Sequence, residues 1–368
     1  MRLSMDKGLS PSSKLVTVVL TIGLMVFGLF FATLQQSGTE QWVTVTRSNP
    51  AAHTDLALYE AIAKRVEAGQ PYYPVALDEH RARRYPVKPF LTVRLPTLAE
   101  IRATTGTGTT VDTAIGLLFV LVISLSWWAR FRPLVGSKHF VNEAPMMLSI
   151  ISMALLASSL TIYISGNFLF MHEVWAGGLL AIALALYRPE NPLPTMIAAA
   201  TALAIRETSL PFILLFGAYA AYHRRWKEGL GWASIALAFG LYLAWHASKV
   251  SSLTYSTDLS GPGWGSFGGW ATYLSFMRDT TILRFFPLAV SAILLPLCLV
   301  GWLGAKQFDG RLMSLFHIGY ALIFMIMGRP DNYYWGFMVA PTLLMGLAFL
   351  PQLVADMRQR WTDAPISG

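Results

Sequence analysis

The chain has 368 residues, of which 54% are hydrophobic and 13% are charged, and its formal net charge is +8. Water-soluble domains usually have about a quarter of their residues charged, so this composition excludes a soluble globular protein and indicates a lipid environment. The basic residues lie mostly beside predicted helix ends, where the positive-inside rule accounts for them, so nucleic-acid binding is not expected. Cys298 is the only cysteine, which excludes an intrachain disulfide and a cysteine-based metal site.

Apolar stretches that approach the roughly 20 residues needed to cross a bilayer begin close to the N-terminus. The first, residues 15–35, follows a short basic start and lacks a good small-residue cleavage site, so we expect an uncleaved anchor whose N-terminus is cytoplasmic. Hydropathy predicts further helices near residues 113–129, 146–164, 172–187, 193–206, 208–222, 229–246, 281–302, 311–327 and 335–350. We therefore predict an all-α, polytopic membrane protein with about ten transmembrane helices, in which residues 1–368 form a single transmembrane domain.

The distribution of Lys and Arg predicts the orientation of these helices. When the chain is threaded from a cytoplasmic start, every cytoplasmic connection carries Lys or Arg, and the C-terminal tail is cytoplasmic as well. Two segments then face outward and are too long to be simple turns: residues 36–111 and residues 249–280. We expect the chemistry of the protein to lie in these two external loops.

The first external loop contains an amphipathic pattern followed by proline-rich segments. Apolar residues recur at helical spacing between Asp55 and Glu67, which predicts a helix lying on the membrane surface. We expect one or two such surface helices in this loop. The prolines in residues 71–74 and 85–90 predict extended or turn geometry. In the second external loop, residues 261–270 form a glycine run with aromatic residues. A mobile lid and a connector with tryptophans in the membrane interface are equal alternatives for this run.

Several ionisable residues lie at the predicted outer ends of the helices. A charge at membrane depth costs about 2.5 to 3.5 kcal/mol and tends to mark a pathway or an active site. Because the predicted topology places all of these residues toward the outer leaflet, a single cavity can gather them. The set consists of Asp55, His172, Glu173, Arg206, Glu207, Arg329 and Asp331.

Each of these residues also has a structural explanation. Arg206 and Glu207 are neighbours whose side chains point in different directions on a helix, so we expect each to meet another partner, and a structural ion pair is the alternative. Residues 329–335 include Tyr and Trp side chains that fit an interfacial aromatic belt. His172 fits a hydrogen-bonded helix end, and Asp55 fits a cap of the surface helix.

Transfer of a sugar from a lipid phosphate requires chemistry that this set of residues can supply. A base must deprotonate the acceptor hydroxyl, and cations must stabilise the departing phosphate. We assign Asp55 as the base, and Arg206 and Arg329 as candidates for binding the donor phosphate, because a guanidinium fork fits phosphate oxygens and keeps its charge. The candidates for lining the cavity and binding the sugar are Tyr59, His172, Glu173, Glu207, Asp331, Tyr333 and Tyr334.

The pattern resembles the C-type (GT-C) glycosyltransferases, multispanning enzymes that use polyprenyl-phosphate sugars and hold a catalytic aspartate in the first external loop. The resemblance rests on the N-in first helix, the sequence Thr-Asp-Leu-Ala-Leu-Tyr at 54–59, the turn Gly-Gln-Pro-Tyr at 69–72, the Arg-Glu pair at 206–207, and the segments at 85–90 and 94–97. It implies a GT-C fold, a polyprenyl-phosphate monosaccharide donor, and inversion of the anomeric centre. It further implies a glycan, lipid or protein acceptor, and a bacterial inner membrane with the active site on the periplasmic side.

The chain departs from this family in two respects. Asp55 has no adjacent acidic residue, so the divalent metal used in some branches is not supported by the sequence, and no cofactor is predicted. The chain also lacks, after its tenth predicted helix, the soluble outer domain of larger members, which predicts a small glycan or a lipid as acceptor.

Two other functions remain open at the level of sequence. A secondary transporter also combines broken apolar segments with buried charges, but the charges here gather at one predicted face and no inverted repeat is seen. A catalytically inactive scaffold or assembly partner is the third alternative, because a degenerate enzyme can keep its fold after losing its chemistry.

Overall fold

The structure is a computed structural model that describes residues 54–135, 144–261, 263, 267–306 and 308–362. The first predicted helix, residues 15–35, lies outside the described residues. Within them the secondary structure is helical, apart from one isolated bridge between Lys88 and Ser260. The predicted all-α class is therefore confirmed.

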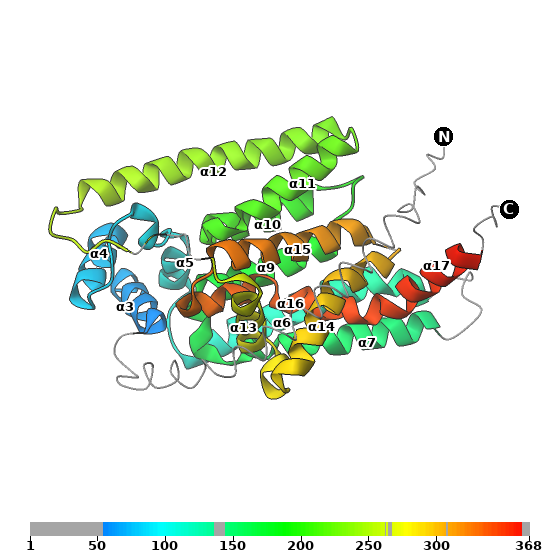
Figure 1. The fold of residues 1–368 in the computed structure, drawn as a ribbon. Helices are drawn as coiled ribbons and strands as arrows, with labels where there is room; N and C mark the ends of the chain where they lie inside the picture. Colours follow the sequence, from blue (N-terminus) through cyan, green and yellow to red (C-terminus); the bar gives the residue numbers. More distant parts are fainter. Residues whose placement is uncertain (1–53, 136–143, 262, 264–266, 307, 363–368) are drawn as a thin grey trace.

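Three short helices form one end of the molecule: α3 (Asp55–Glu67), α4 (Tyr72–Ala82) and α5 (Thr97–Thr105) (Figure 1). Helix α3 is the predicted amphipathic helix, and it buries Leu58, Tyr59, Ile62, Ala63 and Val66. The hydroxyl of Thr54 caps it by accepting a hydrogen bond from the Ala57 amide at 3.3 Å. Asp55 therefore occupies the first turn of the helix and is not its cap.

The prediction of extended or turn geometry across residues 71–74 is wrong. Pro71 is extended and precedes α4, but the helix begins at Tyr72 and includes Pro74 in its first turn. Amides in the first turn of a helix have no helical acceptor, so a proline is tolerated there. At the other end of α4, Arg84 adopts a left-handed φ of 57°, and the Tyr85 amide donates to the His80 carbonyl oxygen at 2.8 Å. This turn directs residues 85–89 into the predicted irregular segment.

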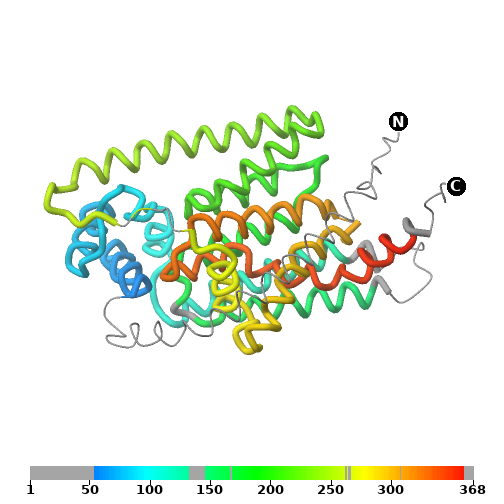
Figure 2. Tube along the Cα trace, viewed as in Figure 1, coloured from blue at the N-terminus to red at the C-terminus, as the bar shows by residue number. Residues whose placement is uncertain are grey.

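The remaining helices form an elongated bundle, with α12 running along one flank (Figures 1 and 2). The longer helices are α6 (Thr109–Val135), α7 (Ala144–Ser159), α9 (His172–Leu186), α10 (Leu193–Ile205), α11 (Leu210–Tyr222), α12 (Trp226–Ser252), α13 (Gly269–Thr280), α14 (Leu288–Gly301), α15 (Gly310–Met327) and α17 (Leu350–Thr362). The short elements are η1 (Phe90–Thr92), α8 (Thr161–Ile164), η2 (Gly166–Phe170), η3 (Glu207–Ser209), η4 (Ile282–Phe285), η5 (Trp302–Gly304), η6 (Pro330–Met338), α16 (Ala340–Leu343) and η7 (Leu344–Phe349).

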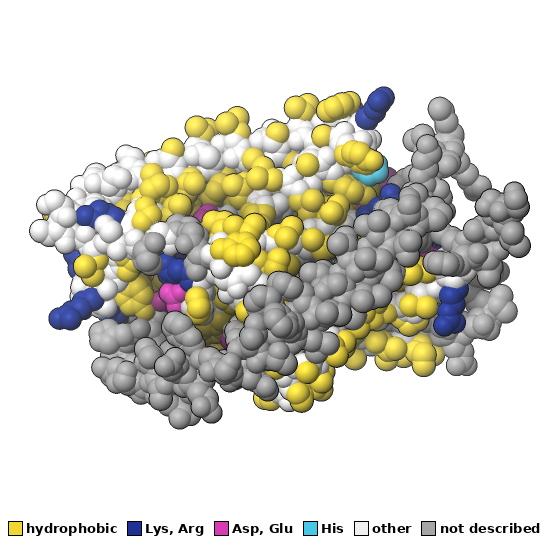
Figure 3. All heavy atoms as spheres, in the orientation of Figure 1, with side chains coloured by type: hydrophobic (Ala, Val, Ile, Leu, Met, Phe, Trp, Pro, Cys, Tyr) yellow, Lys and Arg dark blue, Asp and Glu magenta, His cyan; other side chains and the backbone are white. Residues whose placement is uncertain are grey.

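Four helical stretches in the described residues are long and apolar enough to cross a membrane: Thr109–Phe131, Trp226–Ser252, Gly310–Met327 and Ala340–Gln359. Shorter apolar helices accompany them at Met146–Ser159, His172–Leu186, Leu193–Ile205 and Leu288–Gly304. Figure 3 shows hydrophobic side chains along the flank of the molecule and most of the visible Lys and Arg side chains toward its two ends. These features are compatible with an integral membrane protein.

Some predicted helices differ in extent from those observed. The helix expected at 281–302 begins only at Leu288, after Pro287 and the separate turn η4, because the residue before a proline is disfavoured in the helical region. The helix expected at 335–350 is divided among η6, α16 and η7, with Pro341 at the start of α16. The second predicted loop is not simply irregular, since α12 extends to Ser252 and α13 occupies Gly269–Thr280.

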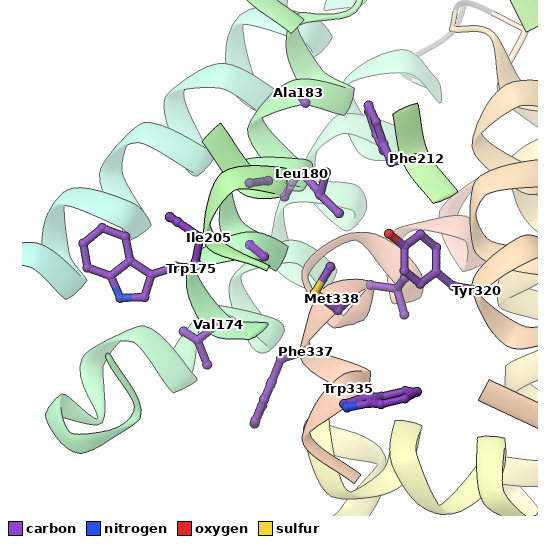
Figure 4. Close-up of a cluster of buried hydrophobic side chains, with 14 of the residues drawn as sticks. Val174, Trp175, Leu180, Ala183, Ile205, Phe212, Tyr320, Trp335, Phe337 and Met338 are labelled. Carbon is purple, nitrogen blue, oxygen red and sulfur yellow. The ribbon is translucent and has the colours of Figure 1, made fainter. Parts of the chain in front are cut away.

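The core is packed closely enough for backbones to touch. Figure 4 shows Val174 of α9 beside Phe337 of η6, whereas Trp175 points away from η6. At Gly177 of α9, an added Cβ would lie 2.0 Å from the Phe337 carbonyl oxygen, so only glycine fits this position. This contact fixes η6, and with it residues 329–335, against the bundle.

Candidate functional site

A cavity of about 280 Å³ lies where the first-loop helices meet the end of α15 and the start of η6. Its wall includes residues 55, 58 and 59 of α3, residues between 80 and 94, Gly261 and Gly263 of the second loop, and residues between 327 and 335. The cavity therefore combines three parts of the chain that are far apart in sequence.

Contacts between the first and second loops hold the second-loop part of the cavity wall in place. The Arg81 guanidinium donates to both Asp258 carboxylate oxygens at 2.8 Å and to the Leu253 carbonyl oxygen at 2.7 Å. Beside this ion pair, the Gly261 amide donates to the Lys88 carbonyl oxygen at 2.6 Å. The part of the second loop from Leu253 to Gly261 is therefore attached to the first loop.

Asp55 lines the cavity from the first turn of α3 and is half-buried. The hydroxyl of Tyr85, another wall residue, is hydrogen-bonded to the Asp55 carboxylate. Burial and the negative charge of Asp55 raise the pKa of Tyr85 well above its usual value. Tyr85 therefore stays protonated and is a donor to Asp55.

His80 is a neutral, buried member of the same wall. Its Nδ1 lies 2.9 Å from the Pro86 carbonyl oxygen. Since a carbonyl oxygen only accepts, Nδ1 carries the proton, which leaves Nε2 as an acceptor. Burial lowers the pKa of His80 to about 4, so the ring is uncharged at neutral pH.

Arg94 is the buried cation of the cavity wall. Its side chain is 10% exposed, and its Nε donates to the Tyr59 hydroxyl at 2.8 Å. The Nη1 atom lies 3.7 Å from Glu207 Oε1, which is too far for a hydrogen bond. Among the described residues, neither Nη1 nor Nη2 of Arg94 has a hydrogen-bond acceptor, so both groups can donate to an anion in the cavity.

Arg206 lies outside the cavity wall, in a buried ion-pair cluster with Glu173 and Glu207. Its Nε is 2.8 Å from Glu173 Oε1, and both side chains are fully buried. Its Nη1 donates to the carboxylate of the adjacent Glu207. The expectation that Arg206 and Glu207 point in different directions is wrong, because α10 ends at Ile205 and Arg206 is extended (φ −141°, ψ 115°).

Arg329 lines the cavity from the connection between α15 and η6 and already has two partners. Its Nε and Nη2 donate to the two Asp331 carboxylate oxygens at 3.1 and 2.9 Å. Its Nη1 donates to the Gly263 carbonyl oxygen at 3.1 Å. Asp331 is also a wall residue, with a side chain that is 67% exposed.

The other predicted site residues divide between the wall and its surroundings. Tyr59 and Tyr334 line the cavity, whereas Tyr333 does not and is 40% exposed. His172 packs behind Tyr59, with 4.9 Å between ring centroids, and borders a separate void of about 10 Å³. Glu173 and Glu207 also lie outside the wall.

Three of the ionisable wall residues have no role predicted from the sequence: Arg94, His80 and Tyr85. The cost of a charge at membrane depth identifies residues at the ends of apolar helices. These three residues lie instead within the first loop, His80 on α4, and Tyr85 and Arg94 between α4 and α5. The available signal was the arginine of the segment at 94–97, which carried part of the family resemblance. Among the described residues, no group of three or more His, Cys, Asp or Glu side chains is arranged to hold a metal ion.

Comparisons with known proteins do not supply a relative. No protein-family pattern matches the chain, and neither the curated proteins nor the solved structures include a significant match. The chemistry of the cavity is therefore the basis for assigning a function.

Proposed function

We propose that the protein is a GT-C-type membrane glycosyltransferase, which transfers a monosaccharide from a polyprenyl phosphate to an acceptor hydroxyl. The observation that carries this proposal is the pairing, in one cavity, of the Asp55 carboxylate with a buried arginine whose Nη groups lack acceptors among the described residues. The cavity lies at the end of a bundle of apolar helices, where a lipid-linked substrate would reach it from the membrane.

The reaction is a single displacement at the anomeric carbon. Asp55 accepts the proton of the acceptor hydroxyl while that oxygen forms a bond to the anomeric carbon. The bond from the anomeric carbon to the phosphate oxygen breaks, and its electron pair stays on the phosphate. The products are the glycosylated acceptor, with its anomeric centre inverted, and polyprenyl monophosphate.

Arg94 is the principal phosphate-binding residue in this proposal. Its free Nη groups and its burial suit the recognition of an anion, because a charge-assisted hydrogen bond is stronger where water is excluded. Arg329, another wall residue, contributes if the phosphate replaces its contact with the Gly263 carbonyl oxygen. Arg206 supports this site from behind and does not contact the substrate.

The membrane topology of the proposal follows the charge distribution. About ten helices cross the bacterial inner membrane, the termini are cytoplasmic, and the cavity opens to the periplasm. The glycan, lipid or protein acceptor would then approach from the aqueous side, past the attached part of the second loop.

The test is transfer of labelled sugar from a panel of synthetic polyprenyl-phosphate donors by protein purified into lipid nanodiscs. We expect Asp55→Asn to lower the rate of transfer by at least about 100-fold, because an amide cannot act as a base. The matched control is Glu60→Gln on the same helix, where Glu60 pairs with the exposed Lys64 at 2.7 Å. This control should transfer sugar at the wild-type rate.

Two outcomes would contradict the proposal. Full activity of Asp55→Asn would remove Asp55 as the base. No transfer from any donor, together with movement of a solute across vesicles, would show a secondary transporter in place of an enzyme.

A further inference from the structure

Glu207 is shared between two arginines of unequal accessibility. It accepts a hydrogen bond from Arg206, which is fully buried behind the cavity, and lies 3.7 Å from Arg94 in the cavity wall. Arg206 in turn is 2.8 Å from the buried Glu173. The charges therefore alternate from the cavity inward, in the order Arg94, Glu207, Arg206, Glu173.

This order keeps Arg94 only partly neutralised. Two arginines and two glutamates make the cluster neutral as a whole, but Glu207 makes its hydrogen bond with Arg206. If Glu207 approached Arg94 more closely, it would occupy the Nη groups that face the cavity. In the structure, Arg206 holds the Glu207 carboxylate on the inner side, 3.7 Å from Arg94.

The proposed reaction increases the charge of the group bound at Arg94. A polyprenyl-phosphate sugar is a phosphodiester with one negative charge, whereas the product is a monoester, whose second pKa is near 6 and whose charge at neutral pH approaches −2. On charge alone, Arg94 would bind the product more tightly than the donor, and slow release would limit turnover.

We propose that Glu207 is a positioning residue that competes with the phosphate product for Arg94 and so promotes product release. This inference rests on the proposed function. The carboxylate of Glu207, 3.7 Å from Arg94, repels the dianionic monoester more strongly than the singly charged donor. Glu207 itself does not contact the substrate.

The test compares two variants that make the same chemical change in the same cluster. Glu207→Gln and Glu173→Gln each remove one negative charge, but only Glu207 lies within 4 Å of Arg94. Binding of a short-chain polyprenyl monophosphate is measured in nanodiscs, with inorganic phosphate in parallel to distinguish the lipid-linked ligand from free phosphate. We expect Glu207→Gln to tighten binding of the polyprenyl monophosphate about tenfold, and Glu173→Gln to change it by less than about threefold.

A kinetic readout separates competition from a merely structural role. Stronger inhibition by added polyprenyl monophosphate is expected in Glu207→Gln, with a lower kcat and a lower KM. A variant that is only misfolded would lose activity without gaining affinity. If Glu207→Gln does not fold, Glu207→Asp keeps the charge for Arg206 but shortens the side chain by one carbon, and it should tighten binding to a smaller extent.

The outcomes distinguish this inference from the proposed function. Unchanged or weaker binding in Glu207→Gln, or equal tightening in both variants, would overturn the competition while leaving the phosphate site intact. Binding in the wild type that is lost in Arg94→Gln would support that site. No binding of either phosphate ligand by the wild type would overturn the phosphate site, and the inference with it.

Discussion

Buried charges beside the cavity are arranged so that no arginine lacks a nearby carboxylate. Arg206 pairs with both Glu173 and Glu207, and Arg94 has Glu207 and the Tyr59 hydroxyl. Removing one partner from a buried pair costs about 3 to 5 kcal/mol, because the remaining charge is left without compensation. A Glu to Gln substitution removes the negative charge but keeps an oxygen acceptor beside the arginine, so it disturbs these pairs less than truncation to alanine would.

His80 gives the stability of the protein a specific dependence on pH. Its pKa is lowered from 6.5 to about 4 by burial, so between these values the unfolded chain binds more protons than the folded one. The contribution of His80 to the free energy of unfolding is therefore fully present above pH 6.5 and is lost as the pH falls toward 4, by up to about 1.4 kcal/mol for each pH unit. Thermal unfolding of the purified protein between pH 4.5 and 7.5 would measure this loss.

The matched variant for this measurement is His80→Asn, whose amide can still donate to the Pro86 carbonyl oxygen but does not titrate. We expect its unfolding temperature to depend less on pH than that of the wild type. An unchanged pH dependence would assign the effect to another group.

The sequence located several wall residues but not the arrangement of their charges. Asp55, Tyr59, Arg329, Asp331 and Tyr334 were selected from helical periodicity, helix ends and aromatic position, and the structure places all five in the cavity wall. No role was predicted for Arg94, because the cost of a charge at membrane depth identifies residues at helix ends, and Arg94 lies in an irregular segment. The pairing of Arg206 with Glu173 depends on α9 packing against α10, which periodicity within either helix does not encode.

Among the helices, α9 and η6 depend on a backbone contact that leaves no room for a side chain. We expect Gly177→Ala to destabilise the protein by about 1 to 3 kcal/mol, because the new methyl group would displace the Phe337 carbonyl oxygen. Gly240→Ala on α12 is the matched control, since nothing lies within 4 Å of an added Cβ there. Alanine is the better helix former, so this control should be neutral or slightly stabilising.

Melting temperatures from size-exclusion chromatography after heating would compare the two glycine variants. A Gly177→Ala protein as stable as Gly240→Ala would show that α9 and η6 can separate without cost.

Element boundaries were predictable where local signals agree. Helix α3 has a cap at Thr54 and a regular apolar face, and its predicted and observed limits coincide. One or two surface helices are expected in the first loop, but the position of α4 was not predicted, because Pro71 and Pro74 are also typical of turns. Helix α13 was not predicted, because it follows the glycine run of the second loop. The limits of the segment at 335–350 depend on how η6, α16 and η7 pack, which hydropathy does not report.

At the scale of the whole molecule, the predicted sidedness can be tested with introduced cysteines. Cys298 is the only native cysteine and is fully buried, so it should contribute little labelling. We expect Glu60→Cys on α3 to react with a membrane-impermeant maleimide in intact cells, because the first loop is predicted to be external. Lys227→Cys, at the start of α12, should react only after permeabilisation.

Labelling of both positions from the same side would contradict the threading of the chain between α3 and α12. Labelling of Lys227→Cys alone in intact cells would invert the whole topology and place the cavity in the cytoplasm.

The three-part wall of the cavity also constrains biosynthesis. Asp55 and Arg94 leave the ribosome well before Gly261, and Arg329 follows later still. The cavity wall is therefore incomplete until the last of these residues has been made. Arg94 finds its counter-charge only when Glu207 has been made. A nascent chain interrupted before residue 335 therefore has the proposed base and phosphate-binding residue but no enclosed chamber, so unfinished copies should be unable to consume the lipid-linked sugar.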